Sequence, residues 1–414
     1  MSTPDRRDST ISRRELLGSA VAAASMSMLG NVNILGAETP KPAAPKRKIK
    51  IGWIGCGGRG HWIVPLFLQH GGYELQAVAD YFPQVAEEAG NKFGVAKTRR
   101  FSGLSGYKKL IDSGIEAILI EDVPYFYPEQ AKAAVEAGLH VYMAKPIAVD
   151  VPGCLTIGAA AKEATLRNRC FLVDYQLPHD PVCIEVATRV RDGGLGKLAH
   201  IASFGMAWHA WPDPPLGKNI ESRLRDEIWL ADTALSGDTI VSYDIHLIDG
   251  IVWILGRRPV SACGRARTCR AEPHGDRTDV ASVIYELPDG TIWTHVTQSI
   301  DNNFDVTTLS ASLFGMEATA HLTYGGKNYV RGGTKHYSGT SGDIYKEGAV
   351  KNVDTFYRNV VEGHYENLSA QRAVDGTLTA ILGRETAARR CFLTMNDLIK
   401  ENKRLEVNLD GMKV

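Results

Sequence analysis

The sequence lacks the paired cysteine and histidine motifs of a structural metal site. Its seven cysteines are an odd number, none stands in a C-x-x-C pair, and the nearest two are Cys263 and Cys269. Most lie in apolar runs, as Cys170 does before FLVD, which favours buried small side chains over a disulfide framework. The histidines are scattered and form no H-E-x-x-H motif. We therefore expect no structural zinc.

The sequence also lacks a net charge and, beyond its first residues, a long uncharged apolar run. Its 47 Lys and Arg balance 47 Asp and Glu, so no net field attracts nucleic acid or anionic lipid. No later segment has the length and apolarity of a membrane helix. A chain of 414 residues exceeds one ordinary core and indicates two domains after any leader. We expect neither a nucleic-acid nor a membrane partner.

The first 37 residues predict a signal peptide. Residues 1–11 are polar, Arg13 and Arg14 follow, and a short Ala- and Ser-rich apolar stretch leads to small residues near Ala37. The stretch is too short for a spanning helix, and the adjacent arginines indicate the twin-arginine route. A disordered basic tail is the alternative. Residues 38–48, rich in Pro, Lys and Ala, predict a linker, and we expect a periplasmic or other extracytoplasmic protein.

A glycine-rich turn follows the first apolar strand, KIKIGWIG. Within G-x-G-x-x-G, the first glycine permits the tight turn, the second lets a pyrophosphate approach, and the third lets helix and strand pack closely. The N-terminus of the following helix offers N–H groups to phosphate. The next strand, ELQAVAD, ends where a carboxylate holds the ribose 2′-hydroxyl. The predicted cofactor residues are Gly55, Gly57, Gly58, Arg59, Gly60 and Asp80.

Asp80 favours NAD over NADP, because a 2′-phosphate would meet its negative charge. Strands and helices continue to alternate, as in EAILIE, in PEQAKAAVEAG with Gly138 as its stop, and in LHVYMAKPIAV. Repeated βα units of this length predict an α/β fold with a doubly wound parallel sheet. We expect a dinucleotide-binding domain over residues 49–170.

A different pattern begins near residue 171. The segments KLAHIASFGMAW, VSACGRARTC, DVASVIYEL and TIWTHVTQS predict strands, and Pro288-Asp289-Gly290 predicts a hairpin turn between two of them. This is the pattern of an antiparallel sheet. NVDTFYRNVVEG and VDGTLTAILGRETAARR predict helices. We expect a second domain over residues 171–414 that binds substrate and mediates oligomerisation.

The segment SGDTIVSYDIHLIDGIVWILG predicts one helix, entered through Gly237 and Asp238 and ended at Gly256, with Asp238 or Thr239 as its cap. On such a helix Ser242, His246 and Asp249 share one face beside an apolar face. This is typical of a helix that borders both a core and a polar cleft. Asp244 would point away from His246, so we reject it as the partner of the imidazole.

The chain resembles the Gfo/Idh/MocA oxidoreductases, the family of glucose–fructose oxidoreductase and inositol dehydrogenase. The resemblance rests on GCGGRG, AVAD, AGLHVYMAKP and IHLIDGIVWILG, and it covers nearly the whole chain after the leader. It implies a Rossmann domain followed by an α/β domain with an open, largely antiparallel sheet. It also implies a homo-oligomer that forms through this sheet.

Several family positions have changed. The family's E-K-P motif is here Ala144-Lys145-Pro146, and Tyr127 stands where the family usually has a histidine. The resemblance implies that Lys145 lies beside the nicotinamide and the reacting hydroxyl. The family also has an aspartate four residues before the histidine of the second domain and another three residues after it. The first is replaced by Ser242, and the second is Asp249.

The residues suggest roles in hydride transfer from an alcohol. The hydroxyl proton must pass to a base whose pKa lies near neutrality, which an imidazole supplies, and we assign this role to His246. Lys145 would stabilise the alkoxide, while Asp249 or Ser242 would orient the imidazole. The alternatives are a structural histidine, a solvated lysine and a surface acid. Trp208 and His209 open WHAWPDPP, which suits stacking on a sugar, although we favour a packing role.

Three functions remain open. The first is an oxidoreductase with tightly bound NAD, rather than NADP, that acts on a carbohydrate, since an exported protein has little access to free NAD. The second is a glycoside-cleaving enzyme in which transient oxidation of a ring carbon permits elimination. The third is a non-catalytic sugar-binding protein, suggested by the altered E-K-P motif and by Ser242.

Overall fold

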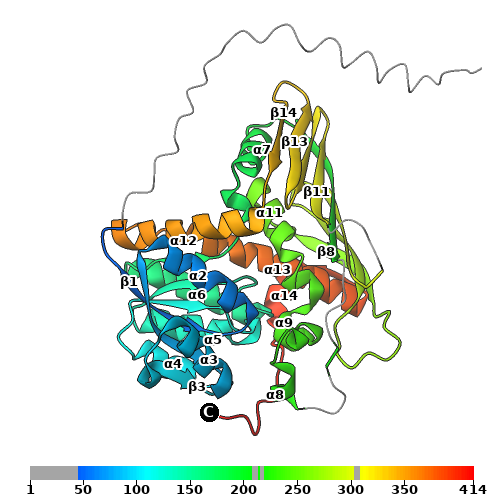
Figure 1. Cartoon of the computed structure of the whole chain (residues 1–414). Helices are drawn as coiled ribbons and strands as arrows, with labels where there is room; N and C mark the ends of the chain where they lie inside the picture. Colours follow the sequence, from blue (N-terminus) through cyan, green and yellow to red (C-terminus); the bar gives the residue numbers. More distant parts are fainter. Residues whose placement is uncertain (1–44, 208–212, 215–218, 303–307) are drawn as a thin grey trace, which may run out of the picture. The chain divides into compact units, whose positions relative to one another are not determined.

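Six parallel strands form the first sheet, in the order β3-β2-β1-β4-β5-β6 (Figure 1). The computed structural model describes residues 45–207, 213–214, 219–302 and 308–414. The strand order reverses between β1 and β4, and in such sheets ligands bind outside the carboxyl ends of the strands at this point. The predicted doubly wound sheet is confirmed. Its strands are β1 (Ile49–Ile54), β2 (Tyr73–Asp80), β3 (Arg100–Ser102), β4 (Ala117–Ile120), β5 (His140–Met143) and β6 (Phe171–Val173).

Helices cover both faces of this sheet. One face packs against α2 (Gly58–His70) and α3 (Pro83–Phe93), and the other against α4 (Gly106–Ile111), α5 (Tyr127–Glu136) and α6 (Val151–Leu166). Helix α12 (Ile344–Glu362), much later in the chain, returns to the α2 face. There the ring of Phe356 lies 5.6 Å from that of Tyr142 and 6.5 Å from that of Phe67. Late residues therefore complete the core of the first sheet.

The second sheet has nine strands, in the order β14-β13-β12-β11-β7-β10-β9-β8-β15. All its pairs are antiparallel except β7 with β10, so the predicted mostly antiparallel sheet is confirmed. Gly290, at φ 80°, lies in the predicted turn between β9 and β10. The strands are β7 (Leu198–Ala207), β8 (Ser261–Arg267), β9 (Val280–Glu286), β10 (Ile292–Ser299), β11 (Thr308–Gly315), β12 (Ala318–Thr323), β13 (Gly326–Gly332), β14 (Tyr337–Ser341) and β15 (Phe392–Thr394).

Helix α13 (Leu368–Arg389) joins the cores of the two sheets. It contacts α6 of the first sheet, α11 (Ile245–Leu255), and strand β8 of the second sheet. One hydrophobic cluster therefore runs from the first sheet through α13 to the second. Its continuity fixes how the carboxyl ends of β1, β4 and β5 face the helices of the second sheet. The remaining helices are α7 (Pro181–Arg191), α8 (Ile220–Arg223), α9 (Thr233–Ser236), α10 (Asp238–Ser242) and α14 (Met395–Glu401).

Some predictions meet the structure only in part. The predicted signal peptide and residues 38–44 of the linker lie outside the described residues, as do Trp208 and His209. The domain boundary at residue 170 stays a prediction; strand β6, which begins one residue later, pairs with β5. Within the described residues, no helix is long and apolar enough to cross a membrane.

Candidate active site

The glycine turn lies at the carboxyl end of β1 and leads into α2. Gly55 has φ +80°, and a Cβ there would lie 2.4 Å from the backbone nitrogen of Asp122, so this turn requires glycine. A Cβ at Gly60 would lie 2.4 Å from Trp53 Nε1, which shows how closely helix and strand pack. A Cβ at Gly57 or Gly58 would meet nothing within 4 Å. The turn is therefore tight on the protein side and open where a pyrophosphate would approach.

Asp80 ends β2 beside this turn, as predicted. Its carboxylate accepts hydrogen bonds from the backbone N–H of Cys56 at 2.8 Å and of Phe82 at 2.9 Å. Burial and the nearby charge of Asp122 raise the pKa of Asp80 to about 6, against the two N–H donors. The acid thus ties the glycine turn to the end of β2 and still faces the cavity.

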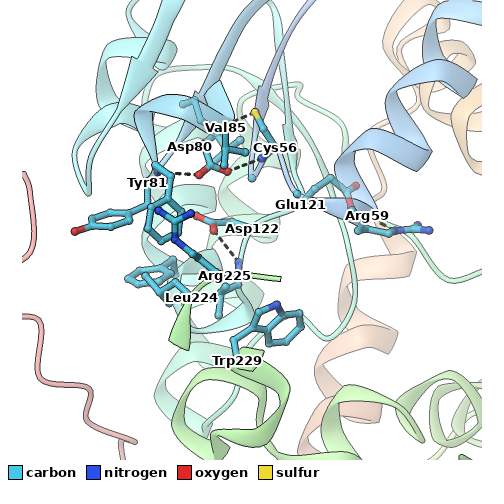
Figure 2. A pocket seen from close by; sticks show the side chains of 18 of the residues that line it. Cys56, Arg59, Asp80, Tyr81, Val85, Glu121, Asp122, Leu224, Arg225 and Trp229 are labelled. Atoms are coloured by element: carbon cyan, nitrogen blue, oxygen red, sulfur yellow. Dashed lines mark hydrogen bonds and ion pairs between the residues drawn. The ribbon is translucent and has the colours of Figure 1, made fainter. Parts of the chain in front are cut away.

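A cavity of about 570 Å³ opens in front of the turn. Its walls come from the glycine turn, from the residues that follow β2 and β4, and from residues 224–230 of the second part of the chain. Figure 2 shows Asp80 and Cys56 on one side of this cavity and Leu224 and Trp229 on the other. The position at the switch point of the sheet and the open glycine backbone suit a dinucleotide.

Arg59, in the first turn of α2, binds two acids that follow other strands. It forms ion pairs with Asp174 after β6 and, at 3.4 Å, with Glu121 after β4. It also donates a hydrogen bond of 2.6 Å to the hydroxyl of Tyr345 on α12. Burial raises the pKa of Glu121 to about 8, although Arg59 acts in the opposite direction. Arg59 therefore links the glycine turn to the ends of β4 and β6 and to helix α12.

Lys145 follows β5 and reaches the second sheet's helices. Its Nζ donates a hydrogen bond of 2.7 Å to the backbone carbonyl of Ser242. Burial, and then the charge of Arg59, lower the pKa of Lys145 to about 7, while the charges of Asp174 and Asp244 oppose this shift. An amine that is partly neutral near pH 7 can either give or accept a proton.

The predicted continuous helix over residues 237–256 is wrong, because α10 ends at Ser242 and α11 begins at Ile245. The N–H of His246 donates to the carbonyl of Tyr243 at 3.4 Å, which leaves the Ser242 carbonyl for Lys145. Asp238 does not act as the expected cap: it lies inside α10 at φ 72°, after the N-cap Gly237.

Asp244 occupies the break and turns into the second sheet. Its carboxylate binds His295 Nε2 on β10 at 3.0 Å. Both side chains are fully buried. A Cβ at Gly205 on β7 would lie 1.9 Å from Asp244 Oδ1. The rejection of Asp244 as partner of His246 agrees with this pairing.

His246 lies at the start of α11 and is held by Tyr324, which no sequence pattern indicated. Its Nδ1 lies 3.2 Å from the Tyr324 hydroxyl, which donates to Gln176 Oε1 at 2.5 Å. Because the phenol has one proton, Nδ1–H must be the donor to Tyr324, and the lone pair of the neutral ring is then on Nε2. Burial, followed by the charges of Lys145 and Arg59, holds the pKa of His246 well below its usual value.

The orienting roles expected for Ser242 and Asp249 are not found. Ser242 Oγ donates to the carbonyl of Asp238 at 2.9 Å. Asp249 pairs with Arg372 of α13 at 3.0 Å, and burial raises the pKa of its carboxyl to about 6. Both side chains therefore stabilise helices α10 and α11 and do not orient the imidazole of His246.

Glu121 and Asp174 were missed, although each directly follows a buried parallel strand, a signal that could have found them. No comparable sequence signal indicates the other residues that the structure brings to the site, which are Gln176, Tyr324, Tyr345 and Arg372.

Two family models match the chain. The one described as "Oxidoreductase family, NAD-binding Rossmann fold" matches residues 49–171. The one described as "GFO/IDH/MocA C-terminal domain" matches residues 184–321. Together they cover the first sheet up to the start of β6 and strands β7 to β11 of the second sheet.

Relatives of known name are similar over parts of the chain. A glycosyl hydrolase family 109 protein of Shewanella pealeana is 28% identical over 207 residues, 46% of this chain and 45% of that protein. Myo-inositol dehydrogenase Hyg17 of Streptomyces leeuwenhoekii is 25% identical over 241 residues, which are 58% of this chain and 66% of the length of that protein. The chain thus spans about half the length of its family 109 relatives. The solved levoglucosan dehydrogenase in complex with NADH has a TM-score of 0.68 at 17% identity, covering 84% of this chain and 99% of that one, which shows the shared fold.

The position of Lys145 generates a prediction about its reactivity. Acetylation of Lys145, followed by peptide mass spectrometry, should have its midpoint at about pH 7, whereas an exposed lysine titrates near pH 10. Asp244→Asn should move the midpoint to lower pH, because the Asp244 charge raises the pKa of Lys145. Asp375→Asn, at an ion pair with Arg258, is the matched control and should leave it unchanged. A midpoint near pH 10 in the native protein would contradict the burial argument.

Proposed function

The chain belongs to the Gfo/Idh/MocA family of NAD-binding oxidoreductases, and from this membership we propose that it oxidises or reduces a sugar or sugar derivative with a tightly held NAD. The observation that carries the proposal is that Lys145 binds the carbonyl of Ser242, four residues before His246, and that the charge of Arg59 at the glycine turn acts on both side chains. Myo-inositol dehydrogenase and levoglucosan dehydrogenase, among the similar proteins, support a carbohydrate substrate.

The residues present fit a dinucleotide. Helix α2 begins without a side-chain cap, so its first N–H groups are available to phosphate. The backbone of Gly57 and Gly58 is open, and Asp80 faces the cavity at the ribose position. NAD in this site would supply the hydride acceptor or donor. Asp80 favours NAD, with NADP as the alternative.

Proton transfer belongs to the chain's own side chains. His246 Nε2 would accept the proton of the substrate hydroxyl, since Tyr324 and Gln176 hold its Nδ1–H. Lys145, fixed on the Ser242 carbonyl, would stabilise the alkoxide by its charge. Asp249 is a positioning residue that holds α11 on α13 through Arg372. Ser242 contributes its carbonyl to Lys145, and any contact with the sugar stays a proposal.

An alternative function is cleavage of a glycoside at the same site. The family 109 relatives and an alpha-N-acetylgalactosaminidase of Shewanella oneidensis favour it. Transient oxidation of a ring carbon acidifies the neighbouring C–H, so that a base can remove this proton and the glycosidic oxygen can leave. A partly neutral Lys145 or the neutral His246 would serve as that base.

The proposal extends to location and assembly. The leader, with Arg13 and Arg14, supports export of the folded chain to an extracytoplasmic space. The outer face of the second sheet supports a homo-oligomer, because Phe204, Ile284, Ile292 and Phe314 are each at least 40% exposed there. The mass measured in solution by light scattering tests this assembly, and a monomer would contradict it.

Variants of the two candidate catalytic residues test the oxidoreductase proposal. His246→Gln and Lys145→Met should each lower turnover on a sugar panel at least about 100-fold, because they remove the base and the electrostatic stabiliser. Both should still contain NAD, detected by mass spectrometry after denaturation. Unchanged turnover would refute the catalytic roles of Lys145 and His246, no turnover in the native protein would support a non-catalytic protein, and native protein without NAD would refute the cofactor proposal.

An aryl-glycoside panel with NAD absorbance followed throughout separates the two enzyme functions. The oxidoreductase should change the nicotinamide redox state with a free sugar and release no aglycone. Aglycone release without a net change in the redox state of the nicotinamide would refute the oxidoreductase proposal and support the glycosidase.

Cell fractionation tests the proposed export. Full-length protein should appear in the extracytoplasmic fraction, and Arg13→Lys with Arg14→Lys should retain it in the cytoplasm, because the route reads the paired arginines. The same exchange at Arg6 and Arg7, another adjacent pair in the leader, is the control. Unchanged export of the Arg13/Arg14 double variant would refute the twin-arginine route.

A further inference from the structure

A segment distant in sequence from the glycine turn forms one wall of the dinucleotide cavity. Residues 220–230, between β7 and α10, contribute Leu224, Arg225, Asp226, Glu227, Trp229 and Leu230 to its lining. They face the end of β2, where Asp80 marks the ribose position. This wall therefore borders the adenosine half of the cavity.

The wall is attached on both sides. At its start, the hydroxyl of Tyr81 lies 3.1 Å from Glu221 Oε1. Arg223, also near its start, forms an ion pair of 2.8 Å with Asp232, which lies just beyond the end of the wall and caps α9. Tyr81 directly follows Asp80, so one contact connects the wall to the ribose-binding end of β2.

The C-terminal tail meets the same tyrosine. The backbone N–H of Lys413 donates to the Tyr81 hydroxyl at 3.2 Å, and the carbonyl of Lys413 accepts from the N–H of Leu104 at 2.9 Å. Figure 1 shows the C-terminus near α8 and β3. Tyr81 thus holds two late segments of the chain at the rim of the cavity.

Arg225 brings a positive charge from this wall to the adenosine end. Its guanidinium carbon lies 4.2 Å from the centroid of the Phe82 ring. Its charge also acts on the carboxyl of Asp80, where it lowers the pKa against the larger effect of burial. Among the described lining residues the arginines are Arg59 and Arg225, and Arg59 is engaged by Asp174 and Glu121. Arg225 is therefore the guanidinium placed to meet the adenosine half.

We propose that residues 220–230 form a cofactor clasp in which Arg225 binds the adenosine half of the dinucleotide and slows its release. A planar guanidinium stacks on aromatic rings and bonds to ribose oxygens, which suits this position. The inference rests on the proposed function, because it requires that the cavity holds a dinucleotide. It adds a binding residue from outside the first sheet, which G-x-G-x-x-G and Asp80 do not provide.

The rate of NAD release tests the clasp. Full-length protein loaded with NAD is diluted into an NAD-consuming enzyme, and the remaining bound NAD is measured over time. Arg225→Ala should release NAD about tenfold faster, as expected for the loss of one cation–π or charge-assisted contact. The release rate of Arg225→Lys should lie between those of the native protein and Arg225→Ala, since lysine keeps the charge and loses the planar group. Arg167→Ala, at an exposed ion pair with Glu163, is the matched control and should match the native protein.

The outcomes distinguish failure of the clasp proposal from failure of the proposed oxidoreductase function. Equal release by native protein and Arg225→Ala would overturn the clasp and leave the oxidoreductase proposal standing. A native protein that binds no NAD would overturn both. If Arg225→Ala unfolds, Tyr81→Phe provides the second test: it removes the hydroxyl that contacts Glu221 and Lys413, and it should also speed release. Release from Tyr81→Phe at the native rate would then overturn the clasp.

Discussion

The hydrogen bond from Lys145 Nζ to the Ser242 carbonyl is the contact on which the candidate site depends. It joins the carboxyl end of β5 in the first sheet to the end of α10 beside the second. In an unbroken helix this carbonyl would accept the N–H of residue 246. The break at residues 243 and 244 releases it, and Asp244 turns away to His295. Lys145 of the first sheet is thus held beside α10 by a carbonyl that the helix does not use.

Charge within the site follows from burial and from Arg59. Lys145 and His246 both lose proton affinity, because burial removes water and the charge of Arg59 opposes a further positive charge. Arg59 itself is held by Asp174 and Glu121. Near neutral pH the site therefore offers a neutral imidazole and a partly neutral amine. The amine, with a pKa of about 7, has the near-neutral pKa that a base requires, whereas the lowered pKa makes the imidazole a weaker base than the sequence led us to expect. Both proposed functions would use this one electrostatic arrangement.

The sequence predicted what is encoded locally. The glycine turn, α2 and the strand ending at Asp80 lie within about 30 residues, each with a periodic pattern that one element imposes. The break in the helix over residues 237–256 could not be predicted, because the apolar period continues through it. Its causes are His295, about 50 residues later, and the room that Gly205 leaves. Asp249 was misassigned for the same reason, since its partner Arg372 comes from a helix more than 100 residues away. Strand ends, in contrast, could have indicated Glu121 and Asp174.

The closure of the cavity depends on late parts of the chain. The glycine turn and Asp80 form one side, but residues 224–230 form another, and the C-terminal tail reaches Tyr81 at the rim. The first sheet also takes part of its core from α12. A dinucleotide site of this construction is complete only when the whole chain has folded. Under the proposed export of the folded chain, the cofactor would enter while the protein is still in the cytoplasm, and the wall formed by residues 224–230 would keep it bound. The proposed export and the wall of late residues would thus both serve retention of the cofactor.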